Sequence, residues 1–149
     1  MPDVPSSDRN QEHILLVDDN RLGLAARKAV LEELGYRITP ARSAIEALTL
    51  FEEGEFALVI TDYRMPRMDG LELILRIRKR SPAIPVVLLS GFVDTLGLEC
   101  GNTGADIVIQ KSANEVNLMV RAVRRLLRAR RKPMQGHYNP AKDGGQCAG

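Results

Sequence analysis

Residues 57–70 read ALVITDYRMPRMDG, a short apolar run followed by an acid and a turn-rich stretch. Residues 57–61 are almost wholly apolar and are bounded by polar residues, so we interpret them as a strand buried on both faces of a parallel sheet. Asp62 ends this run, at the edge where open α/β sheets place their binding crevice. Considered alone, Asp62 is explained equally well as a cap for the following turn. Residues elsewhere in the chain are needed to distinguish these two interpretations.

Four more short apolar runs predict further strands, and segments with apolar residues at helical spacing lie between them. The expected strands are 13–17, 36–39, 85–89 and 106–110, together with 57–61. The expected helices are 21–34, 44–53, 69–81, 94–102 and 112–131. Strands that alternate with helices need crossover connections, which give a parallel sheet with helices on both faces. The sequence therefore predicts a doubly wound α/β domain with five parallel strands and five helices.

Proline and glycine residues limit the extent of three predicted elements. Pro40 directly follows the second predicted strand and should confine it to an edge or a strand end. Gly97 and Gly101 interrupt the predicted helix over 94–102, and we expect that segment to be mobile. The first predicted helix, which Gly35 ends, has apolar residues near helical spacing. These residues are Leu22, Ala26, Ala29, Val30 and Leu34.

The 149 residues suffice for one domain, which we expect over 12–131, after a flexible leader (1–11) and before a disordered polar tail (132–149). The chain has only two cysteines, Cys100 and Cys147, and shows neither a signal peptide nor a run of 18 or more apolar residues. We therefore expect a cytoplasmic protein with no membrane span.

The formal net charge of +2 conceals an uneven distribution. Residues 1–115 contain 13 Lys and Arg against 18 Asp and Glu, whereas residues 116–149 contain 8 Lys and Arg against one acid. The basic stretch Arg121–Lys132 could contact nucleic acid, an acidic lipid surface or an acidic partner, although such a run is commonly a solvated helix face.

Polar residues stand at the carboxyl ends of four predicted strands: Asp18 and Asp19, Asp62, Ser90 and Lys111. In a parallel sheet these ends share one edge, so the side chains should converge. Converging carboxylates repel one another unless a cation joins them, and oxygen ligands favour Mg²⁺. A carboxylate can also attack phosphorus, while Lys111 and the Ser90 hydroxyl could bind phosphoryl oxygens. The alternative, in which Lys111 is an exposed ion-pair partner and Ser90 a turn residue, explains either residue alone but is disfavoured by five polar residues at strand ends.

With these motifs the sequence resembles the receiver domain of two-component response regulators, the CheY-like superfamily, over residues 12–130. The matching motifs are LLVDDN (15–20), ITDYRMPRMDG (60–70), LLSG (88–91) and GADIVIQK (104–111). The resemblance implies a flavodoxin-like fold with strand order 2-1-3-4-5. It implies that Asp62 is the phosphoacceptor, assisted by Ser90 and Lys111. It also implies that Asp19, Asp62 and the backbone carbonyl of Arg64 bind Mg²⁺ directly, with Asp18 acting through water.

Two positions depart from the family pattern. Ser112 follows Lys111 where the family usually has Pro, often with a cis peptide bond, so we expect a trans peptide or a reshaped loop here. Val108 stands where the family has its switch aromatic, so the usual coupling of Ser90 to an aromatic ring cannot operate in its ordinary form. These differences concern output rather than phosphorylation.

The leading hypothesis is a stand-alone receiver that accepts a phosphoryl group from a histidine kinase or a histidine phosphotransfer protein and catalyses only its own phosphorylation and dephosphorylation. Output would then go through a partner-binding surface within 94–131. One alternative is a nucleic-acid-binding or scaffold protein that uses the basic last helix; nonspecific phosphate contact is the most that this helix supports. Another alternative is a small hydrolase with Asp62 as its nucleophile, for which the sequence shows no cap segment.

Overall fold

The computed structural model of the chain describes residues 12–91 and 97–131. The predicted leader 1–11, the predicted tail 132–149 and the loop residues 92–96 lie outside the described residues.

The described residues form a sheet of five parallel strands in the order β2-β1-β3-β4-β5. The predicted fold class and strand order are therefore confirmed. In the register of the sheet, Asp62 lies opposite Leu89, and Ser90 lies opposite Gln110. The strands are β1 (His13–Val17), β2 (Arg37–Ala41), β3 (Leu58–Asp62), β4 (Val86–Ser90) and β5 (Ile107–Gln110).

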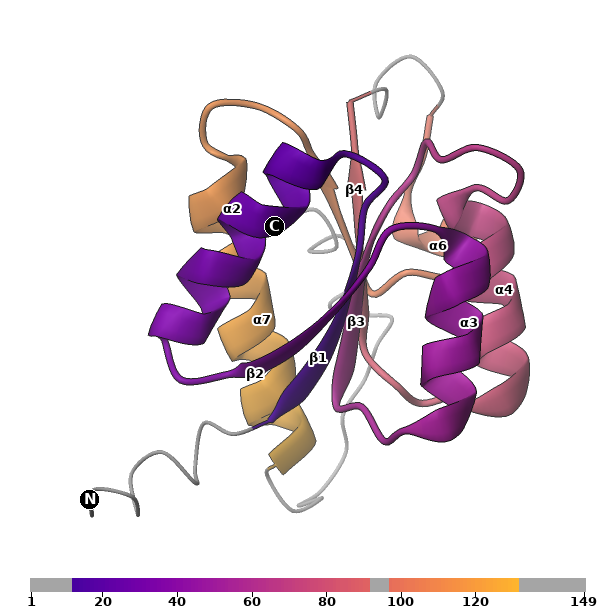
Figure 1. Ribbon diagram of the computed structural model, residues 1–149, viewed down its shortest axis with the longest axis horizontal. Helices are drawn as coiled ribbons and strands as arrows, with labels where there is room; N and C mark the ends of the chain where they lie inside the picture. The colour runs from indigo at the N-terminus through magenta and orange to yellow at the C-terminus, as the bar shows by residue number, and fades with distance from the viewer. Residues whose placement is uncertain (1–11, 92–96, 132–149) are drawn as a thin grey trace.

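Helices cover both faces of this sheet, with α2 and α7 on one side and α3, α4 and α6 on the other (Figure 1). Alternate residues of each strand face opposite layers, so Ile14 and Leu16 pack toward α2 and α7, while Leu15 and Val17 pack toward α3 and α4. The sheet is therefore buried on both faces, as its apolar strands predict. The helices are α2 (Arg21–Glu33), α3 (Ala44–Glu53), α4 (Gly70–Arg80), α6 (Cys100–Thr103) and α7 (Glu115–Arg131).

The caps of three helices explain where they begin. Asn20, Ser43 and Asp69 have extended backbones, and each side chain accepts a hydrogen bond from the backbone N–H three residues later. The sequence pattern itself predicts Ser43 and Asp69 as helix starts, since Glu46 and Glu72 follow them after three residues, and the structure confirms both caps. The cap at Asn20 also fixes the loop that directly follows Asp18 and Asp19.

Most strand bounds differ from the predicted ones by one residue, and β2 differs by more. This strand extends through Pro40 to Ala41, with Pro40 opposite Leu16. Its position at the edge of the sheet is the predicted one. Proline is tolerated there because an edge strand pairs on one side only.

The apolar residues quoted for the first predicted helix do not mark its buried face, apart from Leu34, which packs against the core just after α2. The structure buries Leu24, Arg27 and Leu31 of α2, whereas Leu22 is 83% exposed. Ala26 and Ala29, two of these apolar residues, are also exposed. An arginine in the middle of the buried face hid the correct periodicity, because a charged residue normally marks the solvent side of a helix. The reason for burying this arginine lies in the site described below.

The predicted helix over 94–102 is only partly confirmed in its described part. Residues 97–99 are not helical, and α6 occupies only Cys100–Thr103. Gly97 has φ of 65° and Gly104 has φ of 82°, so left-handed backbone flanks this short helix on both sides. The expected mobility of the segment stays a prediction. Among the described helices, none has the length and apolar character needed to cross a lipid bilayer.

Candidate metal and phosphoacceptor site

Three carboxylates meet at the carboxyl edge of the sheet. Asp18 and Asp19 follow β1, and Asp62 is the last residue of the neighbouring strand β3. One oxygen from each carboxylate can be chosen so that all lie within 4.8 Å of one another. Asp18 and Asp62 are buried, whereas Asp19 is exposed. The structure thus brings the three predicted acids together at one solvent-accessible edge.

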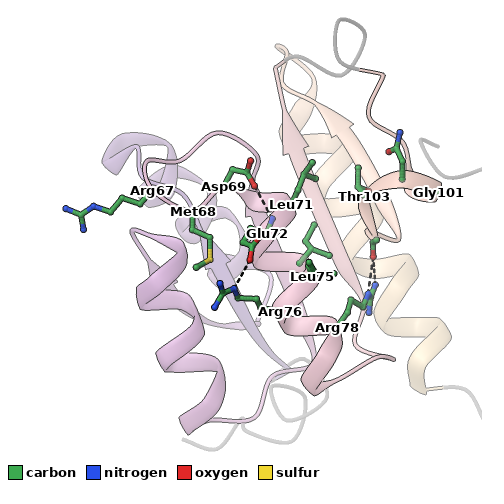
Figure 2. A pocket seen from close by; sticks show the side chains of 13 residues that line it. Arg67, Met68, Asp69, Leu71, Glu72, Leu75, Arg76, Arg78, Gly101 and Thr103 are labelled. Carbon is green, nitrogen blue, oxygen red and sulfur yellow. Dashed lines mark hydrogen bonds and ion pairs between the residues drawn. The ribbon is translucent and has the colours of Figure 1, made fainter.

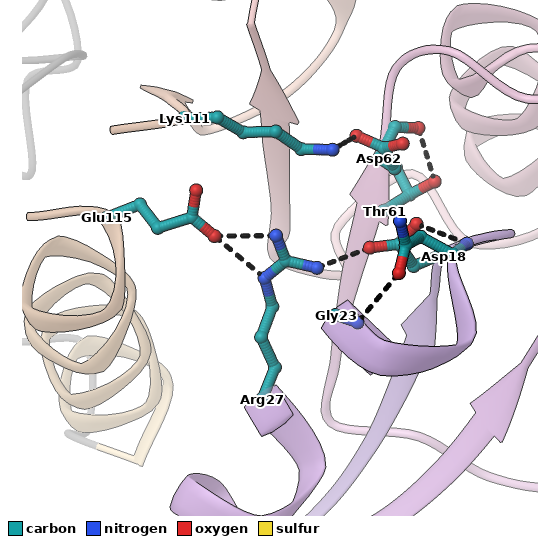
Figure 3. Close-up of polar contacts among 8 residues, drawn as sticks. Asp18, Gly23, Arg27, Thr61, Asp62, Lys111 and Glu115 are labelled. Carbon is teal, nitrogen blue, oxygen red and sulfur yellow. Dashed lines mark hydrogen bonds and ion pairs between the residues drawn. The ribbon is translucent and has the colours of Figure 1, made fainter. Parts of the chain in front are cut away.

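Lys111 reaches this cluster from the far edge strand. Its Nζ lies 2.6 Å from Oδ1 of Asp62, as Figure 3 shows. The backbone N–H of Lys111 donates to the carbonyl of Ser90 at 2.9 Å, which ties the end of β5 to the end of β4. Lys111 is therefore an ion-pair partner of the central carboxylate rather than an isolated surface lysine.

Burial raises the pKa of Asp62 above its ordinary value of 3.8, while the hydrogen bond and charge of Lys111 act in the opposite direction. The negative charge of Asp18 raises this pKa further. An acid that resists ionisation in this way gains from any additional cation placed beside it. The electrostatics of the cluster therefore favour a bound metal ion.

Two other predicted site residues lie at the same edge. Ser90, the last residue of β4, is 1% exposed and stands one residue beyond the register partner of Asp62. Arg64 is exposed and follows Asp62 by two residues. It lines a shallow hollow of about 520 Å³ together with Asp19, Tyr63, Met65, Pro66 and Asp69. The roles of Ser90 and of the Arg64 carbonyl stay predictions.

Arg27 is a residue of this site that the sequence pattern missed. Its guanidinium Nη1 donates to Oδ2 of Asp18, and its Nε and Nη2 donate to Oε2 of Glu115 at 3.0 and 2.5 Å (Figure 3). Burial opposes the charge of Arg27, but the hydrogen bonds and charges of Glu115 and Asp18 outweigh it, so its pKa is raised. The arginine stays charged inside the fold. Arg27 shares the spacing of the buried face with Leu24 and Leu31, but a charged residue in a helix is normally assigned to the solvent side, so the sequence pattern alone does not find it.

Gly70 sets the distance between α4 and β3. A Cβ on Gly70 would lie 2.3 Å from the carbonyl oxygen of Asp62 and 3.0 Å from Cα of Tyr63. The N–H of Gly70 donates to the carbonyl of Tyr63 at 2.8 Å. Only glycine permits this approach, which explains why the motif 60–70 ends in glycine.

The donors at this edge fit a hard divalent cation. The cluster offers carboxylate oxygens, with neither thiolate nor imidazole among the grouped ligands of the described residues. Oxygen donors with a small protein share of the coordination sphere suit Mg²⁺, which usually keeps several waters. The residues present therefore fit the predicted magnesium ion.

A larger hollow of about 760 Å³ lies between α4 and α6 (Figure 2), away from the acidic cluster. Most of its charged residues are already paired with protein groups. Arg76 bridges to Glu72 at 2.9 Å, and Arg78 bridges to Asp106 and donates to the carbonyl of Gly104. The larger volume of this hollow does not make it the better candidate site. The clustered carboxylates at the carboxyl edge of the sheet favour that edge instead.

The two departures from the family pattern have clear structural consequences. Val108 is 4% exposed and packs in the layer that contains α3 and α4. Within the described residues no peptide bond is cis, so Lys111 and Ser112 are joined in trans, as expected. The N–H of Glu115 then donates to the carbonyl of Ser112 at 3.2 Å, leading directly into α7.

The fold and the site together define a class: a doubly wound α/β domain whose acids converge at the carboxyl edge of the sheet. Comparison with known proteins identifies the family within this class. The model of the response regulator receiver domain family matches residues 14–123, and the chain belongs to that family.

Several curated relatives and solved structures resemble the chain. A gliding motility regulatory protein of Myxococcus xanthus is 32% identical over 117 residues, which are 76% of this chain and 15% of that protein. The probable transcriptional regulator ycf27 of Cyanidium caldarium is 32% identical over 136 residues, 88% of this chain and 53% of that protein. The chain thus spans about half or less of these relatives.

Among solved structures, the response regulator protein TrrA of Thermotoga maritima, in complex with Mg²⁺ and BeF, is 34% identical with a TM-score of 0.69. The match covers 77% of this chain and 98% of that one. The receiver domain of the Francisella response regulator 1452 gives a TM-score of 0.73 at 26% identity, covering 80% of this chain and 99% of that one.

Proposed function

We propose that this receiver domain accepts a phosphoryl group on Asp62 from the phosphohistidine of a histidine kinase or a histidine phosphotransfer protein, in a reaction that requires Mg²⁺. The observation that carries the proposal is the arrangement around Asp62. A buried carboxylate at the end of β3 is contacted by Lys111 and lies against two further acids in a shape that fits a divalent cation.

In the proposed reaction a carboxylate oxygen of Asp62 forms a bond to phosphorus. The bond from phosphorus to the donor imidazole breaks, and its electron pair returns to the imidazole nitrogen. Lys111 moves from its ion pair with Asp62 to an oxygen of the transferred group, and the Ser90 hydroxyl donates to another. The product is a mixed anhydride that water hydrolyses, so the protein acts on itself and not on an external substrate.

Mg²⁺ bound here would neutralise the charges of the acids and of the incoming phosphoryl group. We assign Asp19, Asp62 and the backbone carbonyl of Arg64 as its direct protein ligands. Asp18 would act through water, which agrees with its engagement by protein donors. Its Oδ1 accepts from the N–H of Asn20 at 2.9 Å, and its Oδ2 accepts from Arg27.

We also assign the output surface, which was expected within 94–131, to the outer face of α7 beside β5. A groove of about 470 Å³ runs there, with an apolar floor that includes Ile107, Ile109 and Ala122. Four arginines line it at helical spacing, and none of them forms an ion pair with another described residue. These are Arg121, Arg124, Arg125 and Arg128.

This groove fits an acidic segment of a partner protein that also inserts apolar side chains. A second copy of the chain docked through α7 would place arginines against arginines, which is unfavourable. Nucleic acid would satisfy the charges, but α7 has no aromatic side chain on which bases could stack. Whether the receiver acts without an effector domain on the same polypeptide stays a prediction.

The functional class is tested by stoichiometry. With Mg²⁺ and an excess of acetyl phosphate as a small phosphodonor, we expect the protein to take up one phosphoryl group and then to lose it slowly to water. Repeated turnover of an external phosphomonoester such as p-nitrophenyl phosphate would instead support a hydrolase and would contradict the proposal.

A further inference from the structure

Arg27 is a buried cation placed between the metal site and the last helix. The exposed fractions of the side chains of Arg27, Asp18 and Glu115 are 8%, 2% and 15%. Charged side chains are rarely buried to this extent unless they are paired, because removing them from water costs several kcal/mol, on the order of the stability of many domains. The burial of Arg27 therefore depends on its ion pairs with Asp18 and Glu115.

The geometry of the guanidinium determines which elements are joined. Nη1 faces Asp18 at the end of β1, whereas Nε and Nη2 grip one oxygen of Glu115 in the first turn of α7. Arg27 itself lies in the middle of α2. Only a planar fork of donors can hold two carboxylates from two directions in this way; a lysine ammonium is a single point charge.

The position of this positive charge has a consequence for the acidic cluster. Arg27 neutralises the same Asp18 that would help to hold a divalent cation, so the arginine and the metal ion compete for one carboxylate. A cation that binds beside Asp18 weakens the interaction of Arg27 with Asp18. By linkage, the interaction of Arg27 with Asp18 weakens cation binding by the same factor. As the hydrogen bond from Arg27 to Asp18 weakens, the guanidinium should interact more strongly with Glu115.

We propose that Arg27 is a positioning residue that competes with Mg²⁺ for Asp18 and, through Glu115, couples occupation of the metal site to the first turn of α7. This inference rests on the proposed magnesium site but not on phosphorylation. The metal site would then be coupled to α7 through Arg27 and Glu115. This coupling needs no aromatic side chain at position 108, where this chain has Val108.

Mg²⁺ affinity of the unphosphorylated protein tests the competition, measured by isothermal titration calorimetry. Arg27→Gln removes a positive charge beside Asp18 and should tighten Mg²⁺ binding roughly tenfold. Glu115→Gln removes a negative charge that balances Arg27 and should weaken binding several-fold. Opposite changes in affinity are the signature of charge competition. If both variants bind Mg²⁺ more weakly, or neither changes, Arg27 has only a structural role and the inference is overturned.

Arg27→Lys separates charge from geometry. This variant keeps the positive charge, so its Mg²⁺ affinity should stay close to that of the wild type, but it cannot span both carboxylates. Amide hydrogen exchange of residues 113–120 should respond to Mg²⁺ in the wild type and lose that response in Arg27→Lys. An unchanged response in Arg27→Lys would contradict the coupling.

Two further outcomes are distinguishable. Arg27→Gln leaves Asp18 buried without its cation and could fail to fold; Glu115→Gln leaves the Arg27–Asp18 pair in place and, with Arg27→Lys, still decides the question. If the wild type itself does not bind Mg²⁺, the proposed magnesium site fails and this inference fails with it. If the wild type binds Mg²⁺ but the variants do not behave as stated, only the inference fails.

Discussion

At the scale of single residues, the site depends on carboxylates that the fold buries more deeply than their charge favours. Asp62 is 4% exposed and Asp18 is 1% exposed, yet both lie in a cluster with a third acid. Lys111 and Arg27 each compensate one of the buried acids. The balance of these charges contributes to the stability of the domain and, under the proposed function, sets how strongly Mg²⁺ binds.

Asp62 should make the metal-free domain less stable as the pH rises. Because burial raises its pKa above 3.8, the folded state holds the proton more tightly than the unfolded state. Stability is therefore lost as the pH increases from about 3.8 through the raised pKa. Asp62→Asn should remove this loss and increase the free energy of unfolding at pH 7 by roughly 1 kcal/mol. Thermal unfolding in EDTA measures the change.

The exposed Glu53→Gln at the end of α3 is the matched control, since it removes a carboxylate far from the cluster and should leave stability unchanged. A lower midpoint for Asp62→Asn than for the wild type at pH 7 would show that Lys111 more than compensates the burial of Asp62.

Asp19 is exposed, so its substitution should affect metal binding without affecting folding. Asp19→Ala removes one carboxylate ligand and should weaken Mg²⁺ binding by tenfold or more, with a parallel loss in the rate of phosphorylation. Calorimetric titration with Mg²⁺ and the rate of acetyl phosphate labelling measure the two effects. Wild-type affinity in Asp19→Ala would remove Asp19 from the ligand set.

The acidic cluster and Lys111 could be predicted from the sequence because each residue directly ends a recognisable apolar run. Arg27 could not, because a charge within a helix is normally assigned to the solvent side, and its partner Glu115 lies 88 residues away in the sequence. Only the packing of α2 against α7 brings the two together. Local pattern thus identifies groups at strand ends, but not pairs formed by helices that meet across the fold.

At the scale of elements, the junction between β3 and α4 determines how Asp62, the proposed phosphoacceptor, is held. Asp69 caps α4 by accepting from the N–H of Glu72, and Gly70 lets the helix start directly against the carbonyl of Asp62. The sequence predicted the cap and the start of this helix correctly. The close approach could not be predicted, since it depends on the path of the loop between Asp62 and Asp69.

Gly70→Ala should displace the start of α4 from β3. The added Cβ meets backbone atoms, which cannot rotate away as a side chain can. We expect a loss of about 2 kcal/mol or more in the free energy of unfolding, together with slower phosphorylation. Urea denaturation measures the first effect.

Gly91→Ala is the matched control for this prediction, because a Cβ on Gly91 would meet nothing within 4 Å. Equal stability losses in the two variants would show that the approach at Gly70 is not the cause.

At the scale of the whole molecule, the strand order brings residues from distant parts of the chain to one edge and leaves a basic face beside β5. The parallel register places the ends of β1, β3, β4 and β5 together, which the alternation of strands and helices already implied. The basic face was visible as composition, but the groove beneath it depends on how α7 lies across β5.

The basic groove should bind a protein segment rather than nucleic acid. Arg124→Glu with Arg125→Glu should reduce binding of an acidic amphipathic peptide by tenfold or more, while phosphorylation of Asp62 stays unchanged. Fluorescence anisotropy with the labelled peptide and with a DNA duplex measures both. Tight DNA binding that falls steeply with salt would favour the nucleic-acid alternative instead.

The identity of the phosphorylated residue tests the account most directly. After incubation with acetyl phosphate, intact-mass spectrometry should show one added phosphoryl group in the presence of Mg²⁺ and none in EDTA. Borohydride reduction followed by peptide mapping should place the acyl phosphate on Asp62, and Asp62→Asn should show no labelling at this position. Full labelling of Asp62→Asn, or labelling of the wild type that is indifferent to Mg²⁺, would contradict the account.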